Sequence, residues 1–294
     1  MSPLTTLRLC IQSFDISKRF SSLEELRRQF RDQIRGAVDR GANVVLLPEF
    51  SVYAAAQLSG SQDPFKIGSF FWNEVVPEIA DLSRAKGVLI VPGSAPYGAG
   101  KKPENSAAFV VEGQVFRQPK LTLTHWEHEY KPGDQLHVVR WKGLTWVTLI
   151  CFDVEQPEIS SYLKKHVKPN VVLVPSATSD TYGSERVHRC AGARAVELGA
   201  ACAISPLVGV DLKNPLVDRN EGAAALYLPS QRAVESAPVQ QVSPYWTSGT
   251  HEFWVDIHPE VLLKLKTPDK EDTRPYLEHC SVDTLKITRS GDRE

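Results

Sequence analysis

Short, wholly apolar runs that end in proline constrain the fold of this chain more than any other feature. Residues 43–48 read NVVLLP and residues 170–175 read NVVLVP, with no polar alternation in either run. A strand of this composition is buried on both faces, as in sheets that are covered by helices. The similarity of the two runs is compatible with two similar halves, although valine-rich buried strands often look alike.

Amphipathic helices are expected between the strands. In residues 21–40 the apolar side chains recur at steps of three and four, Ser21 and Glu24 are spaced as a capping box, and Gly41 stands where a C-terminal cap belongs. Further helices are expected over residues 72–86, closed by Gly87, and over residues 157–167 and 184–198. Strands alternating with helices predict an α/β fold.

Further strands are expected along the chain. They cover residues 7–11, 88–92, 107–111, 114–117, 201–205, 223–228 and 252–257, with a hairpin across residues 112–113. Residues 230–250, rich in Pro, Ser and Gln, are expected to form a surface excursion, and residues 267–294 a polar tail. Since no linker divides the chain, we expect residues 1–294 to form a single domain with a core over about residues 5–260.

Three reactive side chains stand where strand-like runs end. Cys151 ends the apolar run 143–151, while Glu49 and Lys120 each follow a proline that ends a strand. Taken singly, a cysteine most often packs as a small hydrophobe, and a charge after a strand is usually solvated. A carboxylate, an ammonium group and a thiol at three strand ends are instead typical of an active site, since backbone N–H groups there can stabilise a thiolate or an oxyanion.

Blocks around these residues resemble the signatures of the nitrilase superfamily, the carbon–nitrogen hydrolases. They read LLPE at residues 46–49, PKL at 119–121 and LICFD at 149–153, in the family's order and spacing. Three further segments are similar to the family's Asn-Ser-Ala strand start, Pro-Gly-Asp turn and Arg-Ala-Ile-Glu helix: residues 104–107, 130–134 and 193–197. The resemblance covers about residues 7–257 and implies a four-layer α-β-β-α sandwich with its site at the strand ends.

The resemblance also implies a cysteine-dependent hydrolase that cleaves a non-peptide C–N bond through a thioester. Glu49 would take the proton of Cys151 and return it to the departing amine or ammonia. Lys120 and the backbone N–H of Phe152 would hold the oxyanion of the tetrahedral intermediate. This chemistry requires neither a metal nor an organic cofactor, and none is expected.

Family members carry a second glutamate just before the Pro-Gly-Asp turn. Glu127 and Glu129 are both candidates here, and Glu127 is favoured, although both could be loop carboxylates. The same segment, His-Trp-Glu-His-Glu at residues 125–129, has neither the His-Glu-x-x-His nor the His-x-x-Glu-His order of zinc sites. A metal site is therefore not expected.

The substrate is less constrained than the reaction. A small amide or N-carbamoyl compound is expected ahead of a nitrile, because nitrilases usually have Trp-Glu after the cysteine, where this chain has Phe152 and Asp153. Many members also have Arg where this chain has Glu155, and Asn where it has Leu198, which leaves the substrate open. A non-catalytic member used for binding or assembly is disfavoured, because it would not need all three reactive residues.

The loop after strand 170–175 is expected to line the substrate pocket, because ligands of α/β sheets gather at the carboxyl ends of the strands. Phe152, Thr178 and Arg186 are the candidate contacts. Arg186 could bind a carboxylate or other acidic group of the substrate, or it could form a structural ion pair at the start of a helix. The sequence does not decide between these two roles.

Composition limits the partners and the compartment. The net charge of −1 gives no electrostatic case for nucleic acid or an acidic membrane, and no apolar run approaches the ~20 residues of a membrane span. Five unpaired-looking cysteines and the lack of a signal peptide suggest the cytoplasm. A small-molecule substrate is expected, together with a homodimer or higher homo-oligomer that pairs through the helix over residues 184–198.

Overall fold

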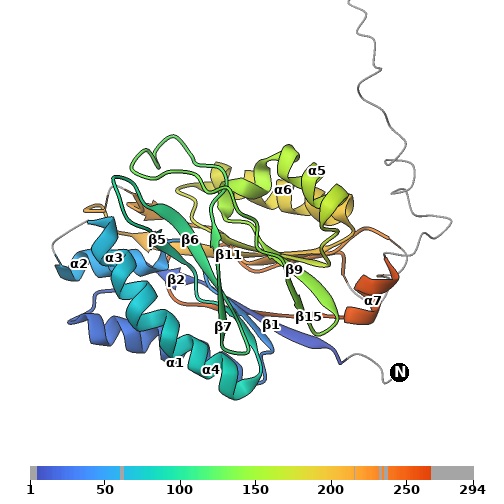
Figure 1. Cartoon of the computed structure of the whole chain (residues 1–294), viewed down its shortest axis with the longest axis horizontal. Coiled ribbons are helices and arrows are strands. Elements are labelled where there is room, and N and C mark those ends of the chain that lie inside the picture. The colour runs from blue at the N-terminus through green and yellow to red at the C-terminus, as the bar shows by residue number, and fades with distance from the viewer. Residues whose placement is uncertain (1–4, 60–62, 215, 232–233, 235–237, 266–294) are drawn as a thin grey trace, which may run out of the picture.

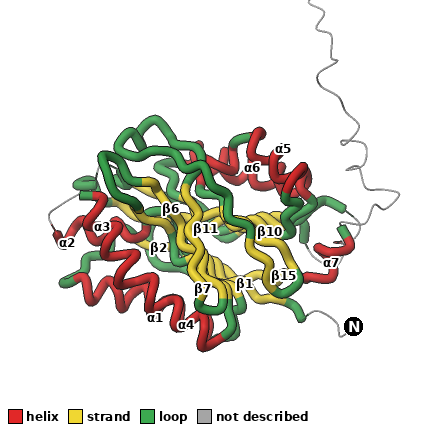
Figure 2. Tube along the Cα trace, in the orientation of Figure 1, coloured by secondary structure: helices red, strands yellow, loops and turns green. Residues whose placement is uncertain are grey.

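Two β-sheets packed face to face, each covered on its outer side by helices, form the molecule (Figures 1 and 2). The computed structural model describes residues 5–59, 63–214, 216–231, 234 and 238–265. This arrangement confirms the α/β fold class and the four-layer α-β-β-α sandwich. The expected polar tail, residues 267–294, lies outside the described residues.

The first sheet has the strand order β15-β1-β3-β4-β6-β5, and β7 also pairs with β6. β1, β3 and β4 are parallel, whereas β15 and the β5-β6-β7 group are antiparallel to their neighbours. The bounds are β1 Leu7–Gln12, β3 Val44–Leu46, β4 Leu89–Val91, β5 Ser94–Tyr97, β6 Glu104–Val111, β7 Gln114–Pro119 and β15 Glu252–Ile257.

The second sheet has the order β14-β13-β11-β10-β9-β8, and β2 and β12 also pair with β11. Its centre, β9-β10-β11, is parallel. The bounds are β2 Phe14–Asp15, β8 Val139–Trp141, β9 Leu144–Thr148, β10 Val171–Ser176, β11 Ala201–Val210, β12 Arg219–Asn220, β13 Ala225–Tyr227 and β14 Gln240–Val242.

Successive side chains of the apolar strands point to opposite faces of their sheet, and this divides the core into three layers. On β3, Val44 and Leu46 point into the cluster between the sheets, whereas Val45 faces the outer helices. On β10, Leu173 lies between the sheets and Val172 faces the helices of the second sheet. Both faces of each strand are therefore buried, which is why the two runs carry no polar residues.

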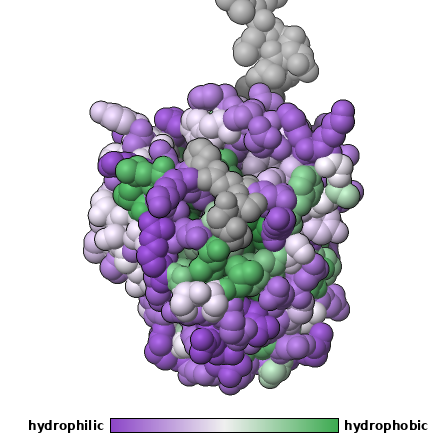
Figure 3. All heavy atoms as spheres, turned by 90° about the vertical axis from the view of Figure 1, so that its left-hand side faces the viewer, coloured by the Kyte–Doolittle hydropathy of each residue, from purple (hydrophilic) through white to green (hydrophobic). Residues whose placement is uncertain are grey.

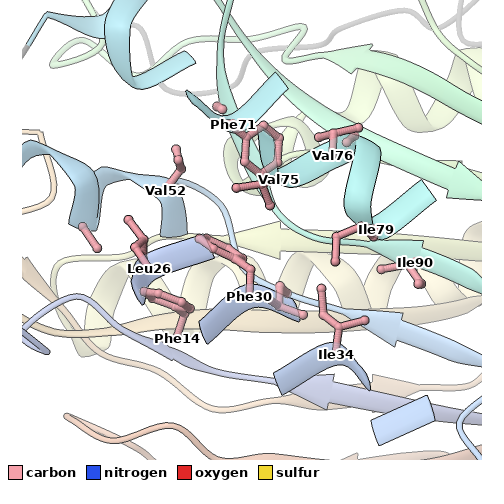
Figure 4. Packing of buried hydrophobic residues seen from close by; sticks show 14 of the residues in the cluster. Phe14, Leu26, Phe30, Ile34, Val52, Phe71, Val75, Val76, Ile79 and Ile90 are labelled. Atoms are coloured by element: carbon pink, nitrogen blue, oxygen red, sulfur yellow. The ribbon is translucent and has the colours of Figure 1, made fainter. Parts of the chain in front are cut away.

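Helices α1 (Leu23–Asp39) and α4 (Val76–Lys86) cover the first sheet, and α5 (Pro157–His166) and α6 (Thr181–Leu198) cover the second (Figure 1). Phe30 of α1 stacks on Phe14 with ring centroids 5.0 Å apart and meets Phe71 edge-on (Figure 4). Replacing such a fully buried Phe by Ala typically costs about 3–5 kcal/mol of unfolding free energy. Short helices complete the fold: α2 Ala56–Ser59, α3 Pro64–Phe70 and α7 Pro259–Lys264.

Several expected boundaries are wrong in detail. The N-cap of α1 is Ser22, whose side chain accepts from the N–H of Glu25, rather than Ser21. The expected helix 72–86 is preceded by α3 and a π-helical turn, Phe71–Val75, so that α4 begins only at Val76. Helix α6 begins at Thr181, because Asp180 caps it.

The expected surface excursion over residues 230–250 is also partly wrong, because it contains strand β14, which pairs with β13. Its three residues are half-buried or exposed at a sheet edge, so they lack the apolar pattern of a strand.

Much of the surface near α2 and α3 is hydrophilic, with hydrophobic side chains gathered near the middle of that face (Figure 3). Among the described helices, none is both long and apolar enough to span a membrane.

Candidate active site

The two sheets contribute different parts of one buried cluster. Glu49 lies just beyond β3 and Lys120 just beyond β7, both in the first sheet. Cys151 lies beyond β9 of the second sheet, where it opens a 3₁₀ turn, Cys151–Glu155. The predicted residues at these three strand ends are thus brought together where the sheets meet.

Lys120 forms the centre of the charge cluster. Its Nζ atom lies 2.8 Å from Oε1 of Glu49 and 2.7 Å from Oε2 of Glu127, and all three side chains are at most 2% exposed. Burial alone would lower the pKa of Lys120, but Glu49 and Glu127 outweigh it and the pKa is raised. Lys120 therefore stays a cation at neutral pH.

Glu49 is held from both sheets. Asn105 Nδ2 donates to its Oε1 over 2.8 Å, and the backbone N–H of Ala177 donates to its Oε2 over 3.1 Å. Burial raises the pKa of Glu49 to about 7, against the opposing effect of Lys120, and the neighbouring Glu127 raises it further. A carboxylate with a pKa near neutrality is suited to accept and return a proton.

The two candidate second glutamates differ sharply in position. Glu127 accepts from the backbone N–H and the hydroxyl of Thr124, both at 2.9 Å, in addition to its ion pair with Lys120. Glu129 is 73% exposed and contacts His128 at 3.2 Å. The geometry therefore brings Glu127 into the cluster and leaves Glu129 on the surface.

Cys151 has a left-handed backbone conformation, with φ of 47°, which non-glycine residues adopt at a cost and which is often found at functional sites. Ser176 Oγ donates to its sulfur over 3.3 Å, and its thiol donates to the carbonyl of Ala177 over 3.5 Å. Burial, followed by the charge of Glu49, raises the pKa of the thiol to about 12. The resting cysteine is therefore a neutral thiol that needs a base.

Two cavities of about 490 Å³ and 240 Å³ both reach Cys151. The smaller one is also lined by Glu49, Lys120 and Glu127. The larger one extends from Cys151 past Trp126 and carries the predicted pocket residues: Phe152, Thr178 and Arg186. The strand-end cluster therefore opens into a space of a size suited to a small molecule.

Phe152, Thr178 and Arg186 line the cavity in different ways. The Thr178 hydroxyl donates to the carbonyl of Glu221 over 2.9 Å, so it fixes the loop while facing the cavity. Arg186 is 58% exposed, and its Nε atom lies 3.3 Å from Oε2 of Glu155. The expected structural ion pair of Arg186 is thus present, but on the cavity wall, so both roles considered for this residue remain compatible with its position.

Sequence reasoning assigned no role to several buried residues of the site. Asn105 donates to Glu49 and, over 3.4 Å, to Glu127. Asp153 receives hydrogen bonds from the loop that follows Lys120, and Ser176 and Ala177 contact Cys151. The sequence signals for these residues were the block similar to an Asn-Ser-Ala strand start and the Asp two residues after the cysteine.

Among described residues, no group of three or more His, Cys, Asp or Glu side chains could hold a metal ion.

The sequence model of the carbon-nitrogen hydrolase family matches residues 6–256. That match spans the two sheets, their covering helices and every residue of the cluster. The chain therefore belongs to the carbon-nitrogen hydrolase family, and the resemblance drawn from the sequence blocks is confirmed.

Similar proteins are amidases. An (R)-stereoselective amidase from a Pseudomonas species is 35% identical over 109 residues, which cover 37% of this chain and 39% of that protein. The crystal structure of an amidase from a Nesterenkonia species matches with a TM-score of 0.67 at 21% identity, over 94% of this chain and 97% of that one. A mutant of the amidase from Nesterenkonia sp. AN1, with the acetamide moiety of fluoroacetamide added covalently at the active-site cysteine, has a TM-score of 0.65 at 20% identity, over 93% and 97% of the chains.

Proposed function

We propose that this protein is a cysteine-dependent amidase that hydrolyses small amides through a thioester on Cys151. The observation that carries the proposal is the buried Lys120, held between Glu49 and Glu127 and opening with Cys151 into one cavity. Family membership and the amidases to which the chain is similar support the same reaction class.

The first half of the reaction forms the thioester. In its ionised form, Glu49 takes the proton of the Cys151 thiol while the sulfur attacks the amide carbon. The carbonyl oxygen becomes an oxyanion, which Lys120 Nζ and the backbone N–H of Phe152 hold. As the tetrahedral intermediate collapses, Glu49 returns the proton to the departing nitrogen, so that ammonia or an amine leaves.

The second half regenerates the enzyme. Glu49 takes a proton from water as the water oxygen attacks the thioester carbon, and the oxyanion is held by the same donors. Collapse breaks the C–S bond, and Glu49 returns the proton to the sulfur of Cys151. Glu127 keeps Lys120 in place through both halves by its short ion pair and its two bonds from Thr124.

The cavity favours a small amide with a compact acyl group. Trp126, Phe152 and Ala177 give an apolar wall, and Arg186 adds a cation to the lining for an acidic substituent. Related amidase structures contain butyramide and acrylamide, which are small neutral amides. An N-carbamoyl compound fits the same proposal, and a nitrile is the alternative substrate, with the same nucleophile and the same lysine.

Ammonia release from a panel of small amides, carbamoyl compounds and nitriles tests the proposal. Purified wild type is expected to hydrolyse at least one amide, and Cys151→Ala none. Cys190→Ala is the matched control, because Cys190 lies half-buried on α6 and lines neither cavity that reaches Cys151. An inactive wild type would contradict the catalytic proposal and favour a binding or assembly role.

A homodimer in the cytoplasm is also part of the proposal. Helix α6 exposes apolar side chains at Tyr182, which is 79% exposed, and Val196, which is 44% exposed. Such side chains on an outer helix suit a twofold contact. Analytical ultracentrifugation at micromolar concentrations is expected to show about twice the chain mass of 32.7 kDa, and a species of the single-chain mass throughout would contradict it.

A further inference from the structure

The parts of the candidate active site come from different sheets, so something must fix the sheets relative to each other at this edge. Lys120 follows β7 of the first sheet, and Cys151 follows β9 of the second. The apolar cluster between the sheets fixes the sheets to each other, and contacts between the two loops set where Lys120 and Cys151 lie at this edge. A misplacement of about 1 Å in an active site can cost about 100-fold in rate.

Asp153 joins these two loops. Its Oδ1 atom accepts from the backbone N–H of Leu121 over 3.0 Å, and from the N–H and hydroxyl of Thr122 over 2.7 Å and 3.0 Å. Its Oδ2 atom accepts from the backbone N–H of Ile150 over 3.1 Å. One carboxylate thus binds the residues directly after Lys120 and the residue directly before Cys151.

The side chain is fully buried, with 0% exposure, and its bonds to backbone N–H groups satisfy it without a direct ion pair. Burial raises the pKa of Asp153 to about 6, against the opposing effect of Lys120, and the N–H groups of Thr122 and Leu121 also lower it. The bond from Ile150 caps the 3₁₀ turn that Cys151 opens, whereas the bonds from Leu121 and Thr122 reach a second loop, which a turn cap alone does not explain. The bonds to both loops are the feature that explains its position.

We propose that Asp153 is a positioning residue that fixes Cys151 relative to Lys120 across the two sheets. It lies outside the cavity walls and acts through the backbone of its neighbours. The inference rests on the proposed function in that Cys151 and Lys120 are taken as nucleophile and oxyanion donor. Loss of the carboxylate should then weaken catalysis while leaving the cavity and substrate binding largely intact.

Asp153→Asn tests this because an amide cannot accept from both loops at once. With its oxygen toward Leu121 and Thr122, its NH₂ group faces the N–H of Ile150, donor against donor, and the bond to the cysteine loop is lost. We expect kcat to fall at least ~10-fold with KM within ~3-fold, because transition-state alignment is lost and ground-state binding is kept.

The matched control is Asp15→Asn. Asp15 also joins two segments, since it accepts from the N–H of Ser17 over 2.9 Å and from the N–H of Gly249 over 2.6 Å, and it lines neither cavity that reaches Cys151. We expect this variant to lose thermal stability with kcat unchanged. A loss of kcat specific to Asp153→Asn then separates positioning from general stability.

A second measurement does not depend on turnover. The rate at which iodoacetamide alkylates Cys151, followed by peptide mass spectrometry across pH, reports how well Lys120 stabilises the thiolate, with Cys190 in the same molecule as the internal control. Removing the charge of Asp153 would by itself favour the thiolate, so a shift of the Cys151 profile to higher pH in Asp153→Asn would report lost alignment with Lys120. If wild type releases no ammonia, the proposed function fails while this profile still tests the role of Asp153.

Unchanged kcat and an unshifted alkylation profile in a folded Asp153→Asn protein, with only its thermal stability lowered, would overturn the inference. If Asp153→Asn does not fold, Thr122→Val decides, since it removes the hydroxyl donor and leaves the carboxylate with the backbone bonds from Leu121, Thr122 and Ile150. A smaller fall in kcat, about 2–5-fold, and a shift of the Cys151 profile in the same direction would support the role of Asp153. Wild-type values in Thr122→Val would overturn it.

Discussion

The Nζ atom of Lys120 lies 2.8 Å from Oε1 of Glu49, although 71 positions separate the two residues in the chain. The contact joins a buried cation to a buried carboxylate that shares the same cation with Glu127. When two carboxylates and one ammonium group are buried in contact, replacing one of them changes the electrostatic environment of the other two.

Replacing Lys120 by Met should destabilise the protein as well as inactivate it. Glu49 and Glu127 would be left buried without their cation, which typically costs about 3–5 kcal/mol of unfolding free energy. Without Lys120, which opposes the effect of burial, the pKa of Glu49 would lie further above that of the unfolded chain, so the folded state would bind more protons and stability would fall as pH rises above ~4.5. Urea unfolding at pH 5 and pH 8 checks this, and a variant more stable at pH 8 would contradict it.

Activity should rise with pH through about 7. The pKa of Glu49 is raised to about 7, and only its ionised form can take the proton of Cys151. The pH dependence of kcat/KM measures this ionisation in the free enzyme. His125→Gln is the control, because His125 lines the larger cavity and histidine ordinarily titrates near neutral pH. If activity of that variant no longer rises with pH through about 7, the rise in the wild type belongs to His125, which would contradict the role of Glu49.

Glu127→Gln should lower kcat about 10-fold or more without unfolding the protein. Lys120 would keep Glu49 as its partner, so no buried charge is left uncompensated, but one of the bonds that orient its ammonium group would weaken. Glu129→Gln is the matched control from the same loop, since Glu129 is 73% exposed. Equal kinetics of the two variants, measured by ammonia release, would show that Glu127 has no special role.

Arg186→Gln should raise KM about 10-fold for amides that carry an acidic group and leave neutral amides unaffected. Arg186 lines the cavity and is held there through Nε by Glu155, so its remaining nitrogens can face a substrate carboxylate. Arg189→Gln, on the same helix and 81% exposed, controls for the loss of a surface charge. Unchanged kinetics with a lower melting temperature would leave Arg186 a structural residue.

The sequence predicted the parts of the fold and site that depend on local pattern. An apolar run ended by proline marked the strand that precedes Glu49, and an apolar run that ends at Cys151 marked the strand before the cysteine. The alternation of helices and strands indicated the layers. Ser22 was missed as the N-cap because two adjacent serines both precede a glutamate at capping distance. Strand β14 was missed because an exposed edge strand needs no apolar pattern.

The sequence could not show which residues hold the reactive groups in place. Ala177 binds Glu49 through its backbone N–H, which any residue could supply, over a separation of 128 positions. Asn105 and Asp153 stand in or beside the signature blocks, but the partners of their bonds lie far away in the chain, at Glu49 and at Thr122, so their roles are visible only in the folded protein. The choice between Glu127 and Glu129 depended likewise on which side of a loop faces Lys120.

The central claim is that Cys151 is the nucleophile and carries the acyl group of the substrate during turnover. Acid quenching of the reaction with a hydrolysed amide, followed by peptide mass spectrometry, tests this most directly. The account predicts the acyl mass on the peptide that contains Cys151, and neither adduct nor ammonia release in Cys151→Ala. An acyl group on another residue, or turnover retained by Cys151→Ala, would contradict it.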